Sequence, residues 1–183
     1  MLKRVREIEA QPETVFKKVS FNEFKKACEK VRPFEMATTT DAQLKKIYDN
    51  IPLPTRSTAG SAGYDFSTPF AIDLDSEHPI ALIPTGIRVS LPKNKFLLLA
   101  PRSGLGFKTG MTLANTMGVI DSDYFYADNE GHIMAKLVRG FSDLSLFPRE
   151  RFMQGIILDY YTTDDDVASV VRTGGFGSTG RGA

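Results

Sequence analysis

The sequence is poor in the residues that build disulfides and metal centres. Among 183 residues there is one cysteine, Cys28, so no disulfide can form within the chain and a reducing compartment is expected. The two histidines, His78 and His132, have no second histidine or cysteine at ligand spacing. We therefore interpret neither histidine as a metal ligand.

The sequence has no large excess of either sign of charge, and its central region has no long apolar run. The 23 basic residues nearly balance the 22 acidic ones, which argues against a broad nucleic-acid or anionic-membrane surface but allows a local basic pocket. The apolar run at 96–100 is far too short to span a bilayer, and residues 1–7 are not followed by the apolar stretch of a signal peptide. A soluble, cytoplasmic, globular protein is expected.

Residues 1–50 are predicted to form an extension with one or two short helices. Ser20 and Glu23 are spaced for a capping box at the start of the first helix, and Pro33 is expected to end it. Its apolar face is predicted to contain Phe21, Phe24, Cys28 and Val31. A second helix is predicted over 41–48. We expect the extension to pack on the main domain or on a neighbouring subunit, with Cys28 as a core residue.

Residues 51–165 have the pattern of an all-β domain. Apolar and polar residues alternate over 87–91, which is the period of a half-buried strand. Turn signals rich in proline, glycine and asparagine separate further strand candidates at 80–83, 96–99, 133–138 and 152–160. Many short strands without a long helical period indicate a β-sandwich or barrel. Residues 166–183, which are rich in glycine, are expected to form a separate C-terminal arm.

The stretch 101–137 begins with residues suited to binding an anion. Arg102 offers a planar fork of donors that matches phosphate oxygens, and Ser103 adds a hydroxyl. Gly104 allows backbone N–H groups to approach an anion closely. A surface turn with a salt-bridged arginine is the alternative explanation of these residues.

The same stretch continues with residues suited to a flat, polar ring. Asn115 can donate and accept, so it can read a base edge, and Gly118 leaves room where a ring would lie. Asp121 could position or deprotonate a water molecule, and Tyr124 offers a face for a sugar or base. A hairpin with turn aspartates is the alternative.

Three other segments carry candidate site residues. Asp65 follows a glycine turn, where capping of its own backbone is the simpler explanation. Gln154 falls within an apolar strand, where a buried amide needs partners, so it is a candidate phosphate contact. The C-terminal arm suits a lid that orders over a nucleotide, with a disordered terminus as the alternative.

Taken in order, five segments resemble the five motifs of the homotrimeric dUTP diphosphatases (dUTPases). The segments are AGYD at 62–65, PRSGLG at 101–106, NTMGVIDSDY at 115–124, RFMQ at 151–154 and GGFGSTG at 174–180. The resemblance covers roughly residues 52–180, and the third and fifth motifs are together the most specific. An insert at 125–130 lengthens the usual hairpin, as in a subgroup found in some bacteria and their phages.

The resemblance implies a β jelly-roll (a distorted barrel), a closed homotrimer with shared active sites, and Mg²⁺-dependent cleavage of dUTP to dUMP and pyrophosphate. Asp121 would hold the water that attacks the α-phosphorus, and Tyr124 would pack on the deoxyribose. Asp65 would reach the metal only through water. The base would be bound by Asn115, Gly118, Val119, Ile120 and Met134, and the phosphates by Arg102, Ser103, Gly104 and Gln154. The arm would add Arg172, Phe176, Gly177, Ser178 and Thr179, with Phe176 stacked on the uracil.

Three points stay open. The family usually places two residues between the arm's arginine and GGFG, but here only Thr173 intervenes, so either Arg172 or Arg181 is the candidate γ-phosphate ligand. The dCTP deaminases share the fold but carry a glutamate on the strand after the hairpin turn, and residues 133–137 contain none. Some phage dUTPases also bind host regulatory proteins through added segments, a role that residues 1–50 or the insert could serve.

Overall fold

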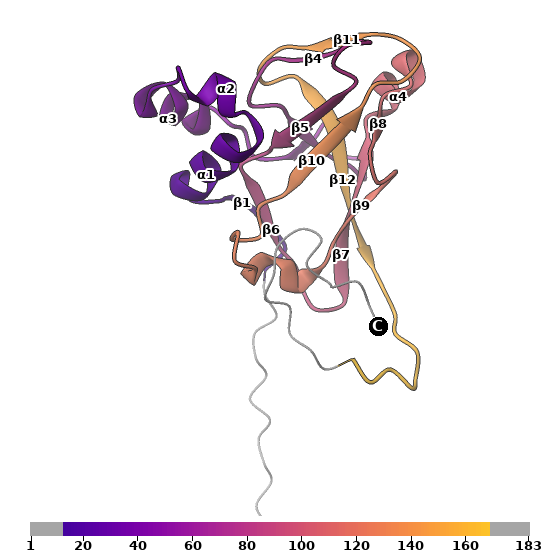
Figure 1. Cartoon of the computed structure of the whole chain (residues 1–183). Coiled ribbons are helices and arrows are strands. Elements are labelled where there is room, and N and C mark those ends of the chain that lie inside the picture. The colour runs from indigo at the N-terminus through magenta and orange to yellow at the C-terminus, as the bar shows by residue number, and fades with distance from the viewer. Residues whose placement is uncertain (1–12, 169–183) are drawn as a thin grey trace, which may run out of the picture.

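A layer of short helices packs on one side of a body of antiparallel strands (Figure 1). The computed structural model describes residues 13–168, so the arm residues Arg172 and 176–179 lie outside the described part of the chain. None of the helices in this range has the length and apolar content that a bilayer-spanning segment needs.

The extension contains both predicted helices, α1 (Phe21–Val31) and α3 (Asp41–Asp49), and two elements that were not predicted. These are β1 (Val15–Lys18), which pairs antiparallel with β6 (Ile87–Ser90), and the single turn α2 (Pro33–Met36). Pro33 ends α1 as expected but also begins α2, because the fixed φ of proline suits the first turn of a helix.

The predicted capping box of α1 forms only in part. The Ser20 hydroxyl accepts a hydrogen bond from the Glu23 N–H at 3.1 Å, as expected. The reciprocal bond from the Ser20 N–H goes instead to the carboxylate of Glu130, at 2.8 Å. The start of α1 is therefore bonded to the insert at 125–130. The two residues are 110 positions apart in the sequence, so a local sequence pattern cannot predict this contact.

The body consists of antiparallel sheets, and all five predicted strands are present with ends shifted by a few residues. A five-stranded sheet has the order β2 (Thr55–Arg56), β3 (Tyr64–Ser67), β12 (Arg151–Asp159), β7 (Lys95–Pro101), β9 (Gly118–Ile120). A second sheet has the order β5 (Ile80–Pro84), β10 (Met134–Val138), β8 (Thr112–Leu113), and β4 (Ile72–Leu74) pairs with β11 (Leu144–Leu146). The architecture is mostly β.

The expectation of an all-β body is wrong at two places. Residues Ser103–Thr109 form helix α4, and Ser122–Tyr126 form a 3₁₀ helix, η1. Gly104 and Gly106 lower the intrinsic helix propensity of α4, and neither helix is long enough to show an apolar period. Gly110 ends α4 with φ of 71°, a left-handed conformation that favours glycine.

The extension shares one hydrophobic core with the body. Phe24 is fully buried and stacks on Phe70, with ring centroids 6.1 Å apart and an interplanar angle of 4°. Leu44 and Ile51 join the same cluster, which continues into the sheets. Cys28 is also in this core, as predicted, and burial raises the pKa of its thiol to about 12. A thiol with that pKa is a packing residue and not a nucleophile.

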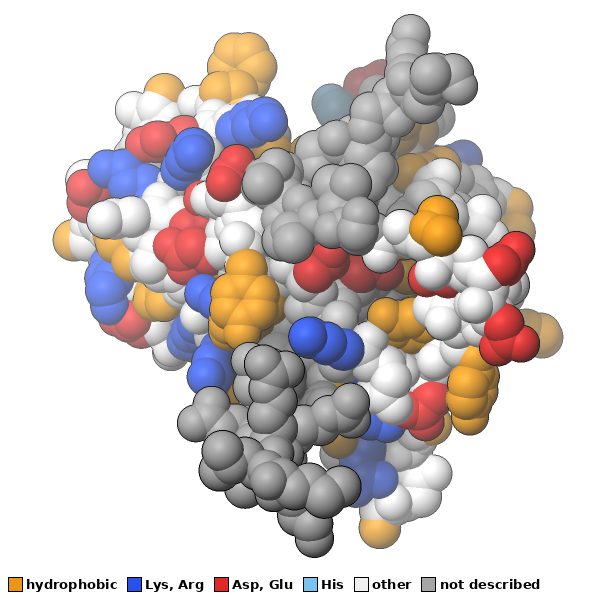
Figure 2. Space-filling model, turned by 90° about the horizontal axis from the view of Figure 1, so that it is seen from below, with side chains coloured by type: hydrophobic (Ala, Val, Ile, Leu, Met, Phe, Trp, Pro, Cys, Tyr) orange, Lys and Arg blue, Asp and Glu red, His pale blue; other side chains and the backbone are white. Residues whose placement is uncertain are grey.

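Charges of both signs are mixed on the surface. Figure 2 shows Lys and Arg side chains interspersed with Asp and Glu among the described residues of one face. This distribution agrees with the near balance of charge in the whole chain.

Candidate active site

The candidate anion-binding residues meet where β3, β7 and β12 lie side by side. Asp65 on β3 is paired with Gln154 on β12, and Arg102 directly follows the end of β7. The Asp65 carboxylate bonds to Arg102 Nε at 3.1 Å and to Arg151 Nη1 at 3.0 Å. It also accepts a bond from the Ser57 hydroxyl at 2.7 Å. Asp65 therefore orients two arginines across three strands, and the simpler explanation as a backbone-capping turn residue is wrong.

Gln154 is held in the same cluster by a close approach of the chain. Its Nε2 donates to the Pro101 carbonyl at 3.4 Å. A Cβ atom added to Gly63 would lie 2.3 Å from Gln154 Oε1. The glycine of the AGYD segment therefore makes space for the Gln154 amide.

Ser103 and Gly104 form the first turn of α4, directly after Arg102 as N-cap. Both residues are exposed, and nothing lies within 4 Å of a Cβ added to Gly104. N–H groups in a first turn precede the intrahelical bonds and need other acceptors. The predicted contact of these groups with phosphate is consistent with this placement and stays a prediction.

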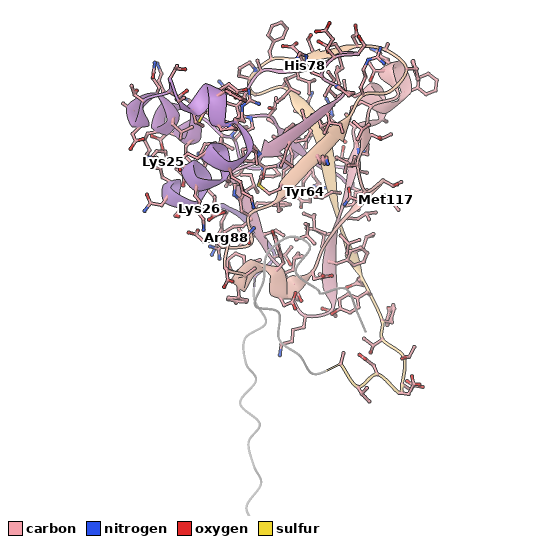
Figure 3. All side chains as sticks on the ribbon, in the orientation of Figure 1. Lys25, Lys26, Tyr64, His78, Arg88 and Met117 are labelled. Atoms are coloured by element: carbon pink, nitrogen blue, oxygen red, sulfur yellow. The ribbon has the colours of Figure 1, made fainter. Side chains whose placement is uncertain are left out.

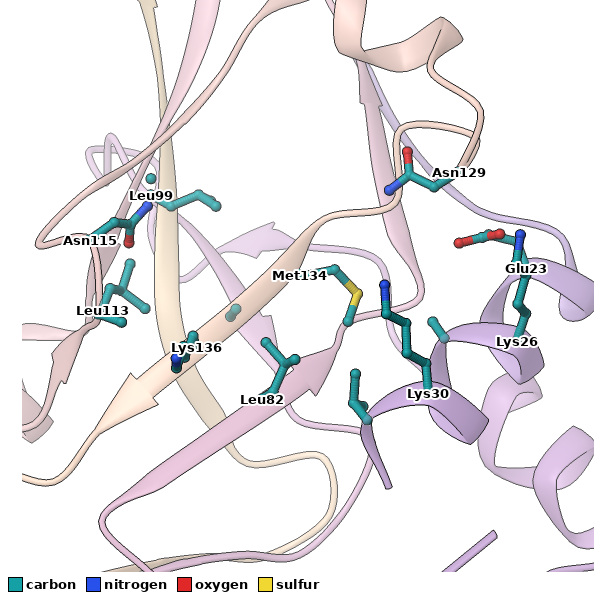
Figure 4. Close-up of a pocket in the computed structure, with 15 residues that line it drawn as sticks. Glu23, Lys26, Lys30, Leu82, Leu99, Leu113, Asn115, Asn129, Met134 and Lys136 are labelled. Carbon is teal, nitrogen blue, oxygen red and sulfur yellow. The ribbon is translucent and has the colours of Figure 1, made fainter. Parts of the chain in front are cut away.

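A cavity of about 660 Å³ lies against the outer face of the β5–β10–β8 sheet (Figure 4). Three of the predicted base-binding residues line it: Asn115, Gly118 and Met134. Its apolar surface comes from Leu82, Leu99, Leu113 and Ala135. This volume falls within the usual range of small-molecule sites.

The other two predicted base-binding side chains do not line this cavity. Ile120 is 3% exposed and belongs to the core, whereas Val119 is 56% exposed on β9. Alternation along β9 turns one of these side chains inward and the other outward. Contact of Val119 and Ile120 with the base, which was expected through backbone groups, stays a prediction. Gly118 has a packing reason as well, since an added Cβ would lie 3.1 Å from the Leu99 side chain.

Asp121 and Tyr124 are positioned by η1. Asp121 is the N-cap of η1 in an extended conformation and is half-buried. The Tyr124 ring is 2% exposed, and its hydroxyl donates to the His132 carbonyl at 2.9 Å and accepts from Asn129 Nδ2 at 2.8 Å. Sequence reasoning missed this anchoring by Asn129 and His132, although a buried tyrosine hydroxyl usually needs a partner. Packing of Tyr124 on a sugar stays a prediction.

His132 is a buried, neutral side chain at the junction of extension and hairpin. Its Nε2 accepts the Gly86 N–H at 2.8 Å, so the ring proton lies on Nδ1, which is 3.4 Å from Glu23 Oε1. Burial lowers the pKa of His132 to about 4. Burial also raises the pKa of Glu23 above its usual value. Nδ1 makes no hydrogen bond in the described part of the chain, so His132 and Glu23 are close neighbours where α1 packs against residues 131–133.

The candidate carboxylate and the candidate anion site lie at opposite ends of β7. In the β7–β9 register Leu97 faces Ile120, which places Asp121 beside Phe96. Arg102 is six residues further along, and at about 3.3 Å per residue the separation is about 20 Å. One chain therefore does not bring Asp121 and Arg102 to the same phosphate chain.

No group of three or more His, Cys, Asp or Glu side chains within residues 13–168 is arranged to hold a metal ion. The carboxylate of Asp65 has both oxygens engaged by arginines. A divalent cation near this cluster would therefore contact Asp65 through water more readily than directly.

Comparison with known proteins gives consistent matches. A family model described as dUTPase matches residues 49–180. The deoxyuridine 5'-triphosphate nucleotidohydrolase of Lactococcus lactis subsp. lactis (strain IL1403) is 37% identical over 158 residues, which are 82% of this chain and 99% of that protein. The enzyme of the same name from Laribacter hongkongensis (strain HLHK9) is 39% identical over 138 residues, 70% of this chain and 88% of that protein.

Solved structures agree with the sequence matches. The dUTPase from Streptococcus mutans has a TM-score of 0.54 and 34% identity, covering 61% of this chain and 88% of that chain. The dUTPase from phage phi11 of S. aureus has a TM-score of 0.52 and 21% identity, covering 68% and 92%. The second likeness concerns the fold alone.

Proposed function

Because the chain belongs to the dUTPase family and hydrolyses dUTP, we propose that its active site is divided between copies of the chain in a closed homotrimer. Asp121 of one copy would act on phosphates held by Arg102 and Gln154 of another. The separation of about 20 Å between Asp121 and Arg102 within one chain is the observation that carries this proposal. A ring of identical head-to-tail contacts is the simplest assembly that joins the two half-sites.

In the proposed reaction Asp121 orients a water molecule toward the α-phosphorus and accepts its proton. The water oxygen bonds to phosphorus, the bond to the β-phosphate oxygen breaks, and pyrophosphate leaves while dUMP remains. Arg102 uses its Nε on Asp65, so its two Nη groups remain for phosphate oxygens. Ser103, Gly104 and Gln154 complete the phosphate contacts. The reaction would remove dUTP, which keeps uracil out of DNA, and it would supply dUMP.

The residues present fit a bound Mg²⁺ held mainly by the three phosphates, with Asp65 contacting it through water. The ion would neutralise charge on the triphosphate as pyrophosphate leaves. Asp65 would also keep Arg102 in place for the same phosphates, while its other oxygen pairs with Arg151.

Base recognition is assigned to Asn115, Gly118 and Met134, together with backbone groups of Val119 and Ile120. A narrow hairpin would reject thymine because its methyl group has no space. From the arm, Phe176 would stack on the uracil, with Gly177, Ser178 and Thr179 near the phosphates and Arg172 or Arg181 on the γ-phosphate. We also infer membership of the bacterial and phage subgroup, which the insert at 125–130 supports.

A product assay with the four dNTPs and Mg²⁺ tests the reaction. We expect dUMP and pyrophosphate from dUTP, with dCTP and dTTP nearly inert. Release of ammonia from dCTP would identify a deaminase instead. Such an outcome is not expected, because β10, the strand after the hairpin turn, carries no glutamate.

Replacing Gly63 by alanine tests the role of Gln154. The new Cβ would displace the end of the Gln154 side chain, a flexible group, so we expect a rise in KM for dUTP of about tenfold with little loss of thermal stability. Gly60→Ala is the matched control, because nothing lies within 4 Å of its added Cβ. If Gly63→Ala and Gly60→Ala had the same KM for dUTP, Gln154 would have no role in substrate binding.

A further inference from the structure

Helix α1 of the extension forms one wall of the cavity that contains the candidate base site. Glu23, Lys26, Ala27, Lys30 and Val31 line it from α1, and Asn115 and Gly118 line it from the opposite side. In Figure 4, Lys26 and Lys30 extend from α1 on one side of the cavity and Asn115 lies on the other. The extension therefore contributes to the same cavity as the hairpin.

The charge of this cavity is unbalanced toward positive. Lys26, Lys30 and Lys136 line it, against the single carboxylate of Glu23. Glu23 is turned toward His132 and its side chain is only 11% exposed. The ammonium groups of the three lysines make no ion pair or hydrogen bond within residues 13–168. The apolar floor of the cavity, formed by Leu82, Leu99, Leu113 and Ala135, lies beside these unpaired ammonium groups. This combination suits a ligand that has both a planar ring and an anionic group.

Helix α1 is fastened rigidly enough to serve as a wall. The Ser20 hydroxyl and N–H both bond to Glu130, at 2.6 and 2.8 Å. Arg88 lies between α1 and η1 in Figure 3, 3.6 Å from Glu130 and with its guanidinium 3.6 Å from the centre of the Phe125 ring. The insert therefore ties α1 to the segment that carries Asp121 and Tyr124. Preorganised positions reduce the entropy cost of binding.

We propose that α1 is part of the nucleotide site and that Lys26 and Lys30 bind the α-phosphate of the nucleotide whose base lies on the apolar floor. This rests on the proposed function and adds to it a phosphate contact from the extension. Lysine is a compact point charge that suits phosphate and has little to offer a neutral uracil ring. The two lysines are one helical turn apart, so both can approach one phosphate group.

Binding of dUMP and of deoxyuridine by titration calorimetry tests this contact, because the two ligands differ only in the phosphate. For the double variant Lys26→Gln/Lys30→Gln we expect dUMP to bind about tenfold more weakly, since bonds between charged groups are the strong ones. The affinity for deoxyuridine should stay within about twofold of wild type. Addition of salt should weaken dUMP binding less in the variant than in wild type.

Lys25→Gln is the matched control on the same helix. Lys25 pairs with Asp41 at 2.7 Å and does not line the cavity. Unchanged dUMP binding in the double variant, an equal loss for both ligands, or the same loss in Lys25→Gln would each overturn the proposal. The wild-type product assay tests the proposed function separately. If the wild type hydrolyses dUTP but the double variant binds dUMP as tightly as the wild type, only the lysine contact is refuted. Light scattering and thermal unfolding check that the variants keep their assembly and fold.

Discussion

Asp121→Asn is expected to lower kcat for dUTP about 1,000-fold while KM changes little. Asparagine keeps the shape of the side chain but cannot accept a proton from the attacking water. General-base catalysis typically contributes 10²- to 10⁴-fold to the rate, roughly the loss expected here. The substrate contacts assigned to the phosphate cluster and the cavity stay in place, so binding should be retained.

Steady-state kinetics with dUTP and Mg²⁺, together with calorimetric titration of dUMP, separate the two effects. Asp123→Asn is the control, because Asp123 is an exposed carboxylate two residues away in η1. If Asp121→Asn raised KM as strongly as it lowered kcat, the role of Asp121 would be binding and not activation of water.

Mixing two inactive variants is expected to restore activity. Arg102→Ala should lose at least about 100-fold in activity, because it removes charged donors from the transferred phosphate group. If Asp121→Asn and Arg102→Ala chains assemble together in the proposed homotrimer, some sites should receive an intact Asp121 from one chain and an intact Arg102 from another. Random assembly at equal amounts makes about one quarter of all sites intact in a closed ring.

The activity is measured after the two variants have been unfolded and refolded together. An activity near a quarter of the wild-type value therefore supports the divided site. Separately refolded variants that are combined only at the end provide the control for slow subunit exchange. If both residues served one site within the same chain, the mixture would stay as inactive as its components. A monomer in light scattering would also contradict the shared site.

Local patterns predicted the elements whose signals lie within a few residues. The capping pattern and apolar spacing located α1 and α3, and alternation located β6. Two short helices in the body were missed, because α4 and η1 have no apolar period and α4 contains two glycines. The strand β1 was missed because its pairing with β6 depends on residues about 70 positions away.

For the site, residue types and order along the chain were enough to name the candidate residues and the family. The motifs carry this information because arginine and glycine-rich turns suit phosphate, and a carboxylate suits the activation of water. The spatial arrangement of these residues could not be predicted from the sequence. It took the strand register to show that Asp121 and Arg102 lie at opposite ends of β7. It took packing to show that Ile120 is a core residue.

The sequence by itself determined the kind of chemistry and the main strands and helices, since each depends on a residue's own functional groups and on near neighbours. Only the tertiary structure decided where the extension lies. A helix with lysines one turn apart is typical of a solvated surface. The bonds from Ser20 to Glu130, 110 positions apart, hold this helix against the hairpin and make its lysines one wall of the cavity. Such contacts join residues remote in sequence, so they depend on how the whole chain packs.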